Sequence, residues 1–209
     1  MLEIYKKINS VVMSREEIYK KLSLLPIPLQ TKISKYKIDE KLQQRIEGID
    51  LLTTALINNI LDVDLINAIQ YNPFGKPFIN AEIDFSISYS HNNIILGFIK
   101  NGAVGVDIER IKAIDYKLYK EYYSKKEWEF IHQNSLVEVN FFKIWTRKEA
   151  VVKAIGKGVF FDFKSVEVID DNITIEDKNL YISSEFIKNE YCFSIASTNL
   201  LQNKNAPIS

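Results

Sequence analysis

Three acidic side chains form the pattern with the clearest chemical meaning, and two of them lie close together. Asp107 and Glu109 belong to an apolar segment, residues 105–109 (GVDIE), that is typical of a strand. Alternate side chains of a strand point to one face, so the two carboxylates are expected on the same face, about 7 Å apart. Two like charges at that spacing need a cation, a proton or water. The pair therefore indicates either a cation site or a strand end at which both side chains simply reach solvent.

The third carboxylate lies on a predicted helix. Residues 145–156 (WTRKEAVVKAIG) place Glu149 and Lys153 four positions apart, so the two side chains share one helix face. Taken alone, this spacing is typical of a solvated ion pair. A tryptophan one turn earlier indicates that the same face also approaches buried surface. If the helix packs beside Asp107 and Glu109, three carboxylates converge into an oxygen-ligand site that suits Mg²⁺ and phosphate.

Groups suited to phosphate lie upstream. Residues 72–77 (NPFGKP) read as a turn in which Lys76 follows a glycine, so that its ammonium can meet an anion. Ser90 and His91 end the strand-like segment 87–91 (ISYSH). The chain has only two histidines, which excludes a multi-histidine zinc site. A histidine at a strand end is more often structural than catalytic.

In this order, the segments resemble the motifs of the Sfp-type 4′-phosphopantetheinyl transferases. That family has a GKP turn, an FNISHS-like strand, a G[VI]D[VI]E strand and a WxxKEAxxKxxGxG helix. The last two motifs match here at every defining position. The FNISHS-like strand departs from the pattern, because Asn92 stands where the family has a serine, and the N-terminal half matches weakly.

The resemblance implies Mg²⁺-dependent transfer of the 4′-phosphopantetheine arm of coenzyme A onto a serine of an apo acyl or peptidyl carrier protein, with release of 3′,5′-ADP. Its implied magnesium ligands are Asp107, Glu109 and Glu149. Glu149 would also receive the proton of the carrier serine, and Lys153 would neutralise the leaving phosphate. His91 completes the expected catalytic residues.

The resemblance also implies contacts with coenzyme A. Ser90 and His91 match positions that hold its phosphates, and Lys76 matches a contact with the nucleotide end. Lys153, through the leaving phosphate, also counts among the residues expected to bind coenzyme A. For the 3′-phosphate the family often has an arginine four residues before a helix glycine, which here falls on Gln44. The basic residues nearby make up the remaining candidates: Lys32, Lys35 and Arg45.

Apolar periodicity predicts helices and strands in an alternating order. The expected helices cover residues 14–25, 29–69 (with a break near Gly48), 124 onwards and 139–155. Capping boxes are expected at the start of the first and third of these helices, at Ser14 with Glu17 and at Ser124 with Glu127. The expected strands cover residues 85–89, 94–99, 104–108, 166–169, 180–186 and 191–196. This order predicts an α+β protein with two halves, residues 1–102 and 103–209. The resemblance adds that the halves are pseudo-symmetric, each a small antiparallel sheet packed with helices, and that one chain encloses coenzyme A at their junction, as a monomer.

Composition excludes several classes of protein. Basic and acidic residues balance at 27 each, which argues against a nucleic-acid-coating protein. The single cysteine, Cys192, excludes an internal disulfide. No apolar run approaches the roughly 20 residues that span a bilayer, so a soluble, cytoplasmic protein is expected. Lysines and tyrosines alternate through residues 112–126, which indicates either a docking surface for an acidic carrier or an ordinary solvated helix.

Two other functions use the same residue types. A magnesium-dependent phosphodiesterase also gathers carboxylates around phosphate, although nothing in the sequence marks a hydrolytic water. A coenzyme A-binding or regulatory module would not need to keep a complete acidic set with Lys153. The sequence does not identify the carrier.

Overall fold

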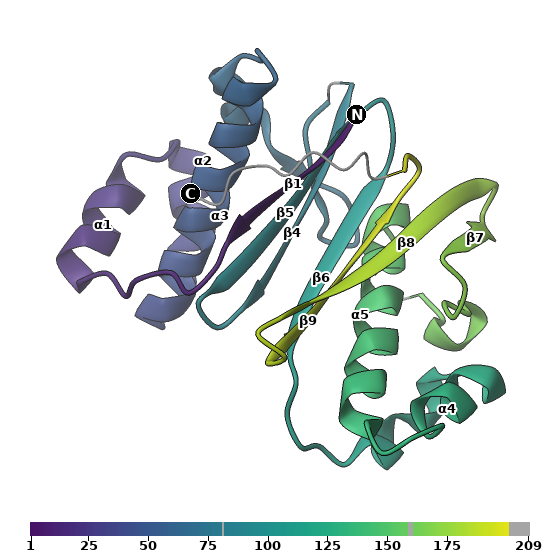
Figure 1. Cartoon of the computed structure of the whole chain (residues 1–209). Helices are drawn as coiled ribbons and strands as arrows, with labels where there is room; N and C mark the ends of the chain where they lie inside the picture. The colour runs from purple at the N-terminus through teal and green to yellow at the C-terminus, as the bar shows by residue number, and fades with distance from the viewer. Residues whose placement is uncertain (81, 159–160, 201–209) are drawn as a thin grey trace.

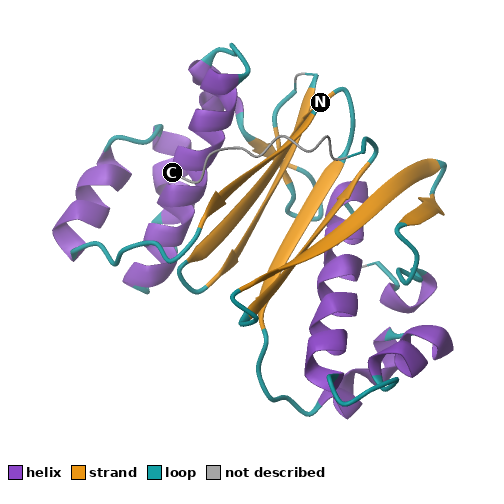
Figure 2. Cartoon of the chain, in the orientation of Figure 1, coloured by secondary structure: helices purple, strands orange, loops and turns teal. Residues whose placement is uncertain are grey.

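Two antiparallel sheets lie in the middle of the molecule, with helices on the outer face of each (Figures 1 and 2). The computed structural model describes residues 1–80, 82–158 and 161–200. The layers run helices, sheet, sheet, helices, because each sheet buries one face against helices and the other against its neighbour. In the described part of the chain, no helix is both long and apolar enough to span a membrane.

The first sheet has the strand order β1–β5–β4. Its strands are β1 (Leu2–Lys7), β4 (Ile83–Ser90) and β5 (Asn93–Lys100), and a small pair is formed by β2 (Gln70–Tyr71) and β3 (Pro77–Phe78). The helices are α1 (Arg15–Ser23), α2 (Ile27–Ile33), α3 (Asp39–Asn58) and the 3₁₀ turn η1 (Val63–Ala68). The predicted capping box of Ser14 and Glu17 starts α1.

The second sheet has the order β6–β9–β8–β7. Its strands are β6 (Val104–Arg110), β7 (Asn172–Ile175), β8 (Lys178–Ile187) and β9 (Tyr191–Ser197). Its helices are η2 (Tyr116–Tyr122), α4 (Lys125–Ile131), α5 (Val137–Ile155) and η4 (Phe163–Ser165). Ser124 and Glu127 form the second predicted capping box, at the start of α4.

The two sheets share one connectivity. In each, a first strand leads into helices, and a hairpin follows whose last strand pairs with the first, giving β1–β5–β4 and β6–β9–β8. The structure thus confirms the α+β class, with antiparallel sheets and helices in two similarly connected parts. Whether residues 1–102 and 103–209 behave as separate domains stays a prediction.

Several details of the predicted secondary structure are wrong, and two of them bear on the site. Gly48 does not break a helix but lies buried inside α3, where a side chain would meet the Tyr89 hydroxyl oxygen at 2.4 Å. The predicted strand at residues 166–169 is an irregular segment. Side chains of α5 bind its carbonyls: Lys148 donates to Val166 and Arg147 donates to Val168 (2.6 Å), so no strand partner is needed.

Gly105 fixes the distance between β6 and α5. A Cβ atom at this position would lie 1.9 Å from the carbonyl oxygen of Ala150 and 2.4 Å from the amide nitrogen of Ala154. Helix and strand therefore touch through their backbones, which only glycine permits. The residues of α5 on either side of this contact are brought directly over β6.

Candidate active site

The edge of β6 that does not pair with β9 faces β4, and side chains rather than backbone groups join the two strands. Three amides of β6 donate to alternate side chains of β4. The pairs are Val104 with Asp84 Oδ2 (2.9 Å), Val106 with Ser86 Oγ (3.1 Å) and Ile108 with Ser88 Oγ (3.3 Å). This set of contacts, called the seam below, gives hydrogen-bond partners to the backbone amides at the free edge of β6, where the two sheets meet.

Asp107 lies beside the seam and is 4% exposed. Its Oδ1 accepts a hydrogen bond from Ser88 Oγ (2.9 Å) and forms an ion pair with Lys153 Nζ (2.6 Å). Its Oδ2 is buried and finds no hydrogen-bond partner among the residues that the structure describes. A buried carboxylate oxygen without a partner costs free energy unless a cation or a donor reaches it.

Burial and the negative charge of Asp107 both raise the pKa of Glu109 and of Glu149. Burial, with Asp107 next in importance, raises the pKa of Glu109 to about 7. Burial raises the pKa of Glu149 as well, and Asp107 adds to the effect while Lys153 opposes it. The three carboxylates are therefore close enough to repel one another. However, the part of the chain described here contains no group of three or more His, Cys, Asp or Glu side chains that could hold a metal ion by itself.

Two lysines from different parts of the chain bind carbonyls of β6. Lys153 Nζ donates to the carbonyl of Val106 (3.1 Å), in addition to its ion pair with Asp107. Lys76 Nζ donates to the carbonyl of Val104 (3.1 Å) and pairs with Asp84 (2.7 Å). Burial lowers the pKa of Lys76, which Asp84 partly offsets. Both ammonium groups thus already have carboxylate partners.

The turn that carries Lys76 is attached to the end of α5. Asn72 Oδ1 accepts from the amides of Phe74 (3.0 Å) and Lys76 (2.9 Å), which holds the turn in shape. Asn72 Nδ2 donates to the carbonyl of Gly156 (2.7 Å), the left-handed residue that ends α5. This contact links the GKP turn to the helix that carries Glu149 and Lys153.

A cavity of about 430 Å³ opens between these elements. Apolar and aromatic side chains form much of its wall, together with charged groups from both parts of the chain. The charged lining residues are Lys32, Arg45, Lys76, Glu149 and Lys153. The lining does not include the predicted residues Lys35, Ser90, His91, Asp107 and Glu109. The cavity therefore gathers four of the predicted cations and one of the three carboxylates.

Aromatic rings hold the cations of the N-terminal wall. The Arg45 guanidinium lies 4.0 Å from the Tyr89 ring centre and 5.0 Å from that of Tyr36, and its Nε is buried without a hydrogen-bond partner in the described part of the chain. Lys32 Nζ lies over the Tyr71 ring, and burial lowers its pKa. An uncompensated cation on a cavity wall favours an anionic ligand.

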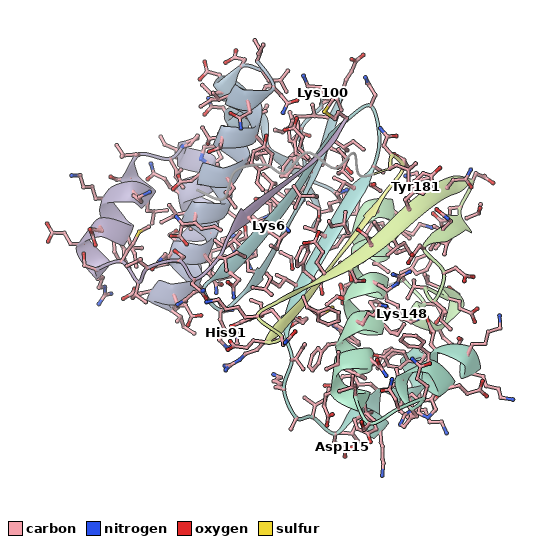
Figure 3. All side chains as sticks on the ribbon, viewed as in Figure 1. Lys6, His91, Lys100, Asp115, Lys148 and Tyr181 are labelled. Atoms are coloured by element: carbon pink, nitrogen blue, oxygen red, sulfur yellow. The ribbon has the colours of Figure 1, made fainter. Side chains whose placement is uncertain are left out.

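Ser90 and His91 lie apart from the cavity wall, at the turn between β4 and β5. Ser90 is buried, whereas His91 is exposed and has φ 51° (Figure 3). The His91 ring contacts Tyr191 edge-on at 6.2 Å, and its carbonyl accepts from Gln44 Nε2 (2.7 Å). At position 44, where the family often has an arginine, the glutamine side chain therefore binds the backbone of the β4–β5 turn.

Sequence reasoning missed Ser88 and Asn72 as residues of the site. The signal for Ser88 was present, because Ser86, Ser88 and Ser90 alternate along one strand and so share a face. No local pattern marks the contact of Asn72 with Gly156, which joins positions 84 residues apart.

Comparison with known proteins agrees with the resemblance seen in the sequence. Residues 103–202 match the family model described as the 4′-phosphopantetheinyl transferase superfamily. The 4′-phosphopantetheinyl transferase gsp of Aneurinibacillus migulanus is 37% identical over 129 residues, which cover 60% of this chain and 53% of that protein. The transferase Sfp of Bacillus subtilis (strain 168) is 26% identical over 184 residues, covering 84% of this chain and 81% of that protein.

A solved structure, the holo-[acyl-carrier-protein] synthase of Thermotoga maritima, aligns with a TM-score of 0.36 at 16% identity, over 46% of this chain and 61% of that one. A likeness this weak supports no inference about fold or activity. The fold consists of two antiparallel sheets with outer helices, and the family match covers the second sheet and its helices. Residues 103–202 of the chain are thus similar to the 4′-phosphopantetheinyl transferase superfamily, and the match to the gsp protein spans about half of that relative's length.

Proposed function

We propose that the protein is a 4′-phosphopantetheinyl transferase that moves the phosphopantetheine group of coenzyme A onto a serine of an apo acyl or peptidyl carrier protein, with Mg²⁺. The observation that carries the proposal is the position of Glu149, which lines a cavity with four cationic side chains and whose pKa is raised by burial and by the charge of Asp107, while burial, Asp107 and Glu149 raise the pKa of Glu109. Residues 103–202, which contain all three carboxylates, match this superfamily. We also propose that the protein acts as a monomer in the cytoplasm.

The carboxylates suit a hard cation, although not as a complete cage. Asp107 offers a buried oxygen that lacks a partner among the described residues, and burial together with the charge of Asp107 raises the pKa of Glu109 and of Glu149. Mg²⁺ is usually held by one or two carboxylates together with waters and substrate phosphates. Such an ion would neutralise negative charge on the pyrophosphate oxygens during transfer.

The chain's own residues account for the proton and for the leaving group. The hydroxyl oxygen of the carrier serine attacks the phosphorus of the phosphopantetheine arm, and the bond from that phosphorus to the oxygen of 3′,5′-ADP breaks. Glu149, whose raised pKa suits a general base, takes the serine proton directly or through a water. Lys153 lines the same cavity and supplies positive charge near the departing phosphate.

The other cationic side chains predicted to bind coenzyme A differ in whether they line the cavity. Arg45 and Lys32 line the cavity and are proposed to bind the 3′-phosphate, whereas Lys35 lies outside the lining. Lys76 lines the cavity with its charge already paired to Asp84, so we propose that it shapes the nucleotide end of the site. The proposed contacts of Ser90 and His91 with coenzyme A phosphates require the ligand to extend beyond the cavity.

A surface of η2 is proposed to receive the carrier protein. Tyr119 and Tyr122 pack edge-on against Trp145, one turn before Glu149 on α5. Leu118 is 75% exposed beside Lys117 and Lys120. This surface therefore combines positive charge and apolar groups close to the proposed base, as an acidic helical partner requires.

Reversal of charge on this surface tests the docking. Lys117→Glu with Lys120→Glu should raise the Michaelis constant for the carrier several-fold and leave that for coenzyme A unchanged, because only encounter with the acidic partner is weakened. Lys20→Glu, on the exposed side of α1, is the control for a charge reversal away from this surface. An unchanged constant for the carrier would exclude η2 as the docking surface.

Intact-mass spectrometry of apo carrier proteins incubated with the protein, coenzyme A and Mg²⁺ tests the function. We expect a mass gain of one phosphopantetheine group that disappears with EDTA and with Glu149→Gln, while coenzyme A still binds to the variant. Coenzyme A binding without transfer to fatty-acid, polyketide or peptidyl carriers would instead favour the binding module. Hydrolysis of coenzyme A without a carrier would favour the phosphodiesterase.

A further inference from the structure

Ser88 connects three groups of the site through one hydroxyl. The side chain is 4% exposed, at the centre of the seam between β4 and β6. Its Oγ donates to Asp107 Oδ1 (2.9 Å) and accepts from the amide of Ile108 (3.3 Å) and from Lys153 Nζ (3.2 Å). A serine hydroxyl has one donor and two acceptor sites, so all of its hydrogen-bonding capacity is used here.

The two oxygens of Asp107 are treated differently by this arrangement. Ser88 and Lys153 both bind Oδ1, whereas Oδ2 is buried and has no partner within the residues described. Ser88 itself is anchored to the backbone of β6 one residue after Asp107. The carboxylate is therefore held by one oxygen while the other is left for a further ligand.

We infer that Ser88 is a positioning residue for the proposed metal ligand Asp107, through the hydrogen bond that fixes Oδ1 and presents Oδ2 to Mg²⁺. The inference rests on the proposed function, because it needs the cation. Hydrogen bonds to ligating carboxylates set their orientation, and their loss typically costs about 10–100-fold in metal affinity. Ser88 is not a proposed metal ligand and reaches the proposed metal site through its hydrogen bond to Asp107.

Ser86 provides a matched control. It lies two residues earlier on β4, is 3% exposed, and accepts from the amide of Val106 (3.1 Å) as Ser88 does from that of Ile108. No hydrogen bond joins Ser86 to a carboxylate among those found for the described residues. Ser86→Ala and Ser88→Ala therefore remove equivalent contacts of the seam. Only Ser88→Ala also removes the hydrogen bonds to Asp107 and Lys153.

The test is calorimetric titration of Mg²⁺ into the protein saturated with coenzyme A. We expect Ser88→Ala to weaken Mg²⁺ binding about tenfold or more, Ser86→Ala to leave it within about twofold, and Ser88→Thr, which keeps the hydroxyl, to recover most of the affinity. Ser88→Cys keeps the volume with a weaker donor and replaces Ser88→Ala if that variant does not fold.

Equal Mg²⁺ affinity in Ser88→Ala and the wild type would overturn the inference, as would an equal loss in Ser86→Ala, which would show a general effect of the seam. Absence of Mg²⁺ binding by the wild-type complex would overturn the metal site and the inference together. The mass-spectrometric transfer assay decides the proposed function separately, since it detects transfer whatever Ser88 does.

Discussion

Replacement of Gly105 by alanine should damage the site more than it damages the fold. The added Cβ would lie 1.9 Å from the Ala150 carbonyl oxygen, whereas ordinary contact begins at 3.4 Å, so β6 and α5 must separate by about 1.5 Å. The three atoms nearest to the new methyl group all belong to the backbone of α5 and cannot rotate away. Overpacking of this kind costs about 1–3 kcal/mol, and here the strain falls on the contact between two elements of the site.

The separation acts on Lys153 and Glu149 directly. The ion pair of Lys153 with Asp107 has a length of 2.6 Å, so a shift of about 1.5 Å breaks its geometry. A displacement of about 1 Å can cost about 100-fold in rate. We therefore expect Gly105→Ala to lower kcat at least about 100-fold, measured by carrier modification, with a loss of about 1–3 kcal/mol in the free energy of unfolding by urea.

Gly97→Ala separates the effect on the site from the effect on the fold. A Cβ at Gly97, on β5, would meet methyl groups of Val104 and Val106 at 2.8 Å and does not touch α5. It should lower stability by a similar amount while kcat falls much less. If Gly105→Ala retained kcat within twofold of the wild type, or if both variants lost activity in proportion to stability, the close approach of α5 to β6 would not set the catalytic geometry.

Three further predictions concern other contacts. Asn72→Ala removes the hydrogen bond to Gly156 and should raise the KM for coenzyme A by up to about tenfold, in steady-state assays, because a net hydrogen bond contributes about 1 kcal/mol. Lys148→Met should lower the free energy of unfolding by about 3–5 kcal/mol, because it leaves the fully buried Glu127 carboxylate without its ion-pair partner. Burial raises the pKa of Cys192 to about 11, so its contribution to stability is complete below pH 9 and is lost as the pH rises towards 11. The fall in unfolding free energy over that range should be smaller in Cys192→Ala.

Each of these predictions has its own control. Asn72→Ser keeps a short acceptor for the turn but cannot reach Gly156, so its KM for coenzyme A should be raised as in Asn72→Ala. A KM equal to that of the wild type would show that the contact with Gly156 does not affect coenzyme A binding. The double variant Glu127→Gln with Lys148→Met should recover part of the lost stability, and no recovery would contradict the charge explanation. An equal alkaline loss in Cys192→Ala and wild type would assign the loss to other groups.

Local patterns explain what the sequence predicted well. The capping boxes at Ser14 and Ser124 start helices because their contacts lie within four residues. The alternation of side chains around Asp107 is likewise a local pattern, and it predicts the strand β6. The sequence left open whether the helix with Glu149 packs beside this strand, and the structure shows that it does, since Gly105 allows close contact.

Long-range contacts explain what the sequence did not predict. β1 was missed because its pairing with β5 joins Leu2 to Ile99, and its short mixed sequence gives no clear period of its own. Residues 166–169 alternate like a strand, but their carbonyls are bound by Arg147 and Lys148, which no periodicity reveals. Sequence spacing also could not show which predicted cations face the cavity, because that depends on how the two sheets meet.

The seam has a consequence for the protein as it is synthesised. β6 ends the second sheet with an edge whose amides and carbonyls are bound by side chains of β4, Lys76 and Lys153. A second part made without the first would expose that edge, and bare strand edges recruit strands of other chains. The first part leaves the ribosome earlier, so the side chains of β4 are already present to cover the edge of β6 when the second part folds.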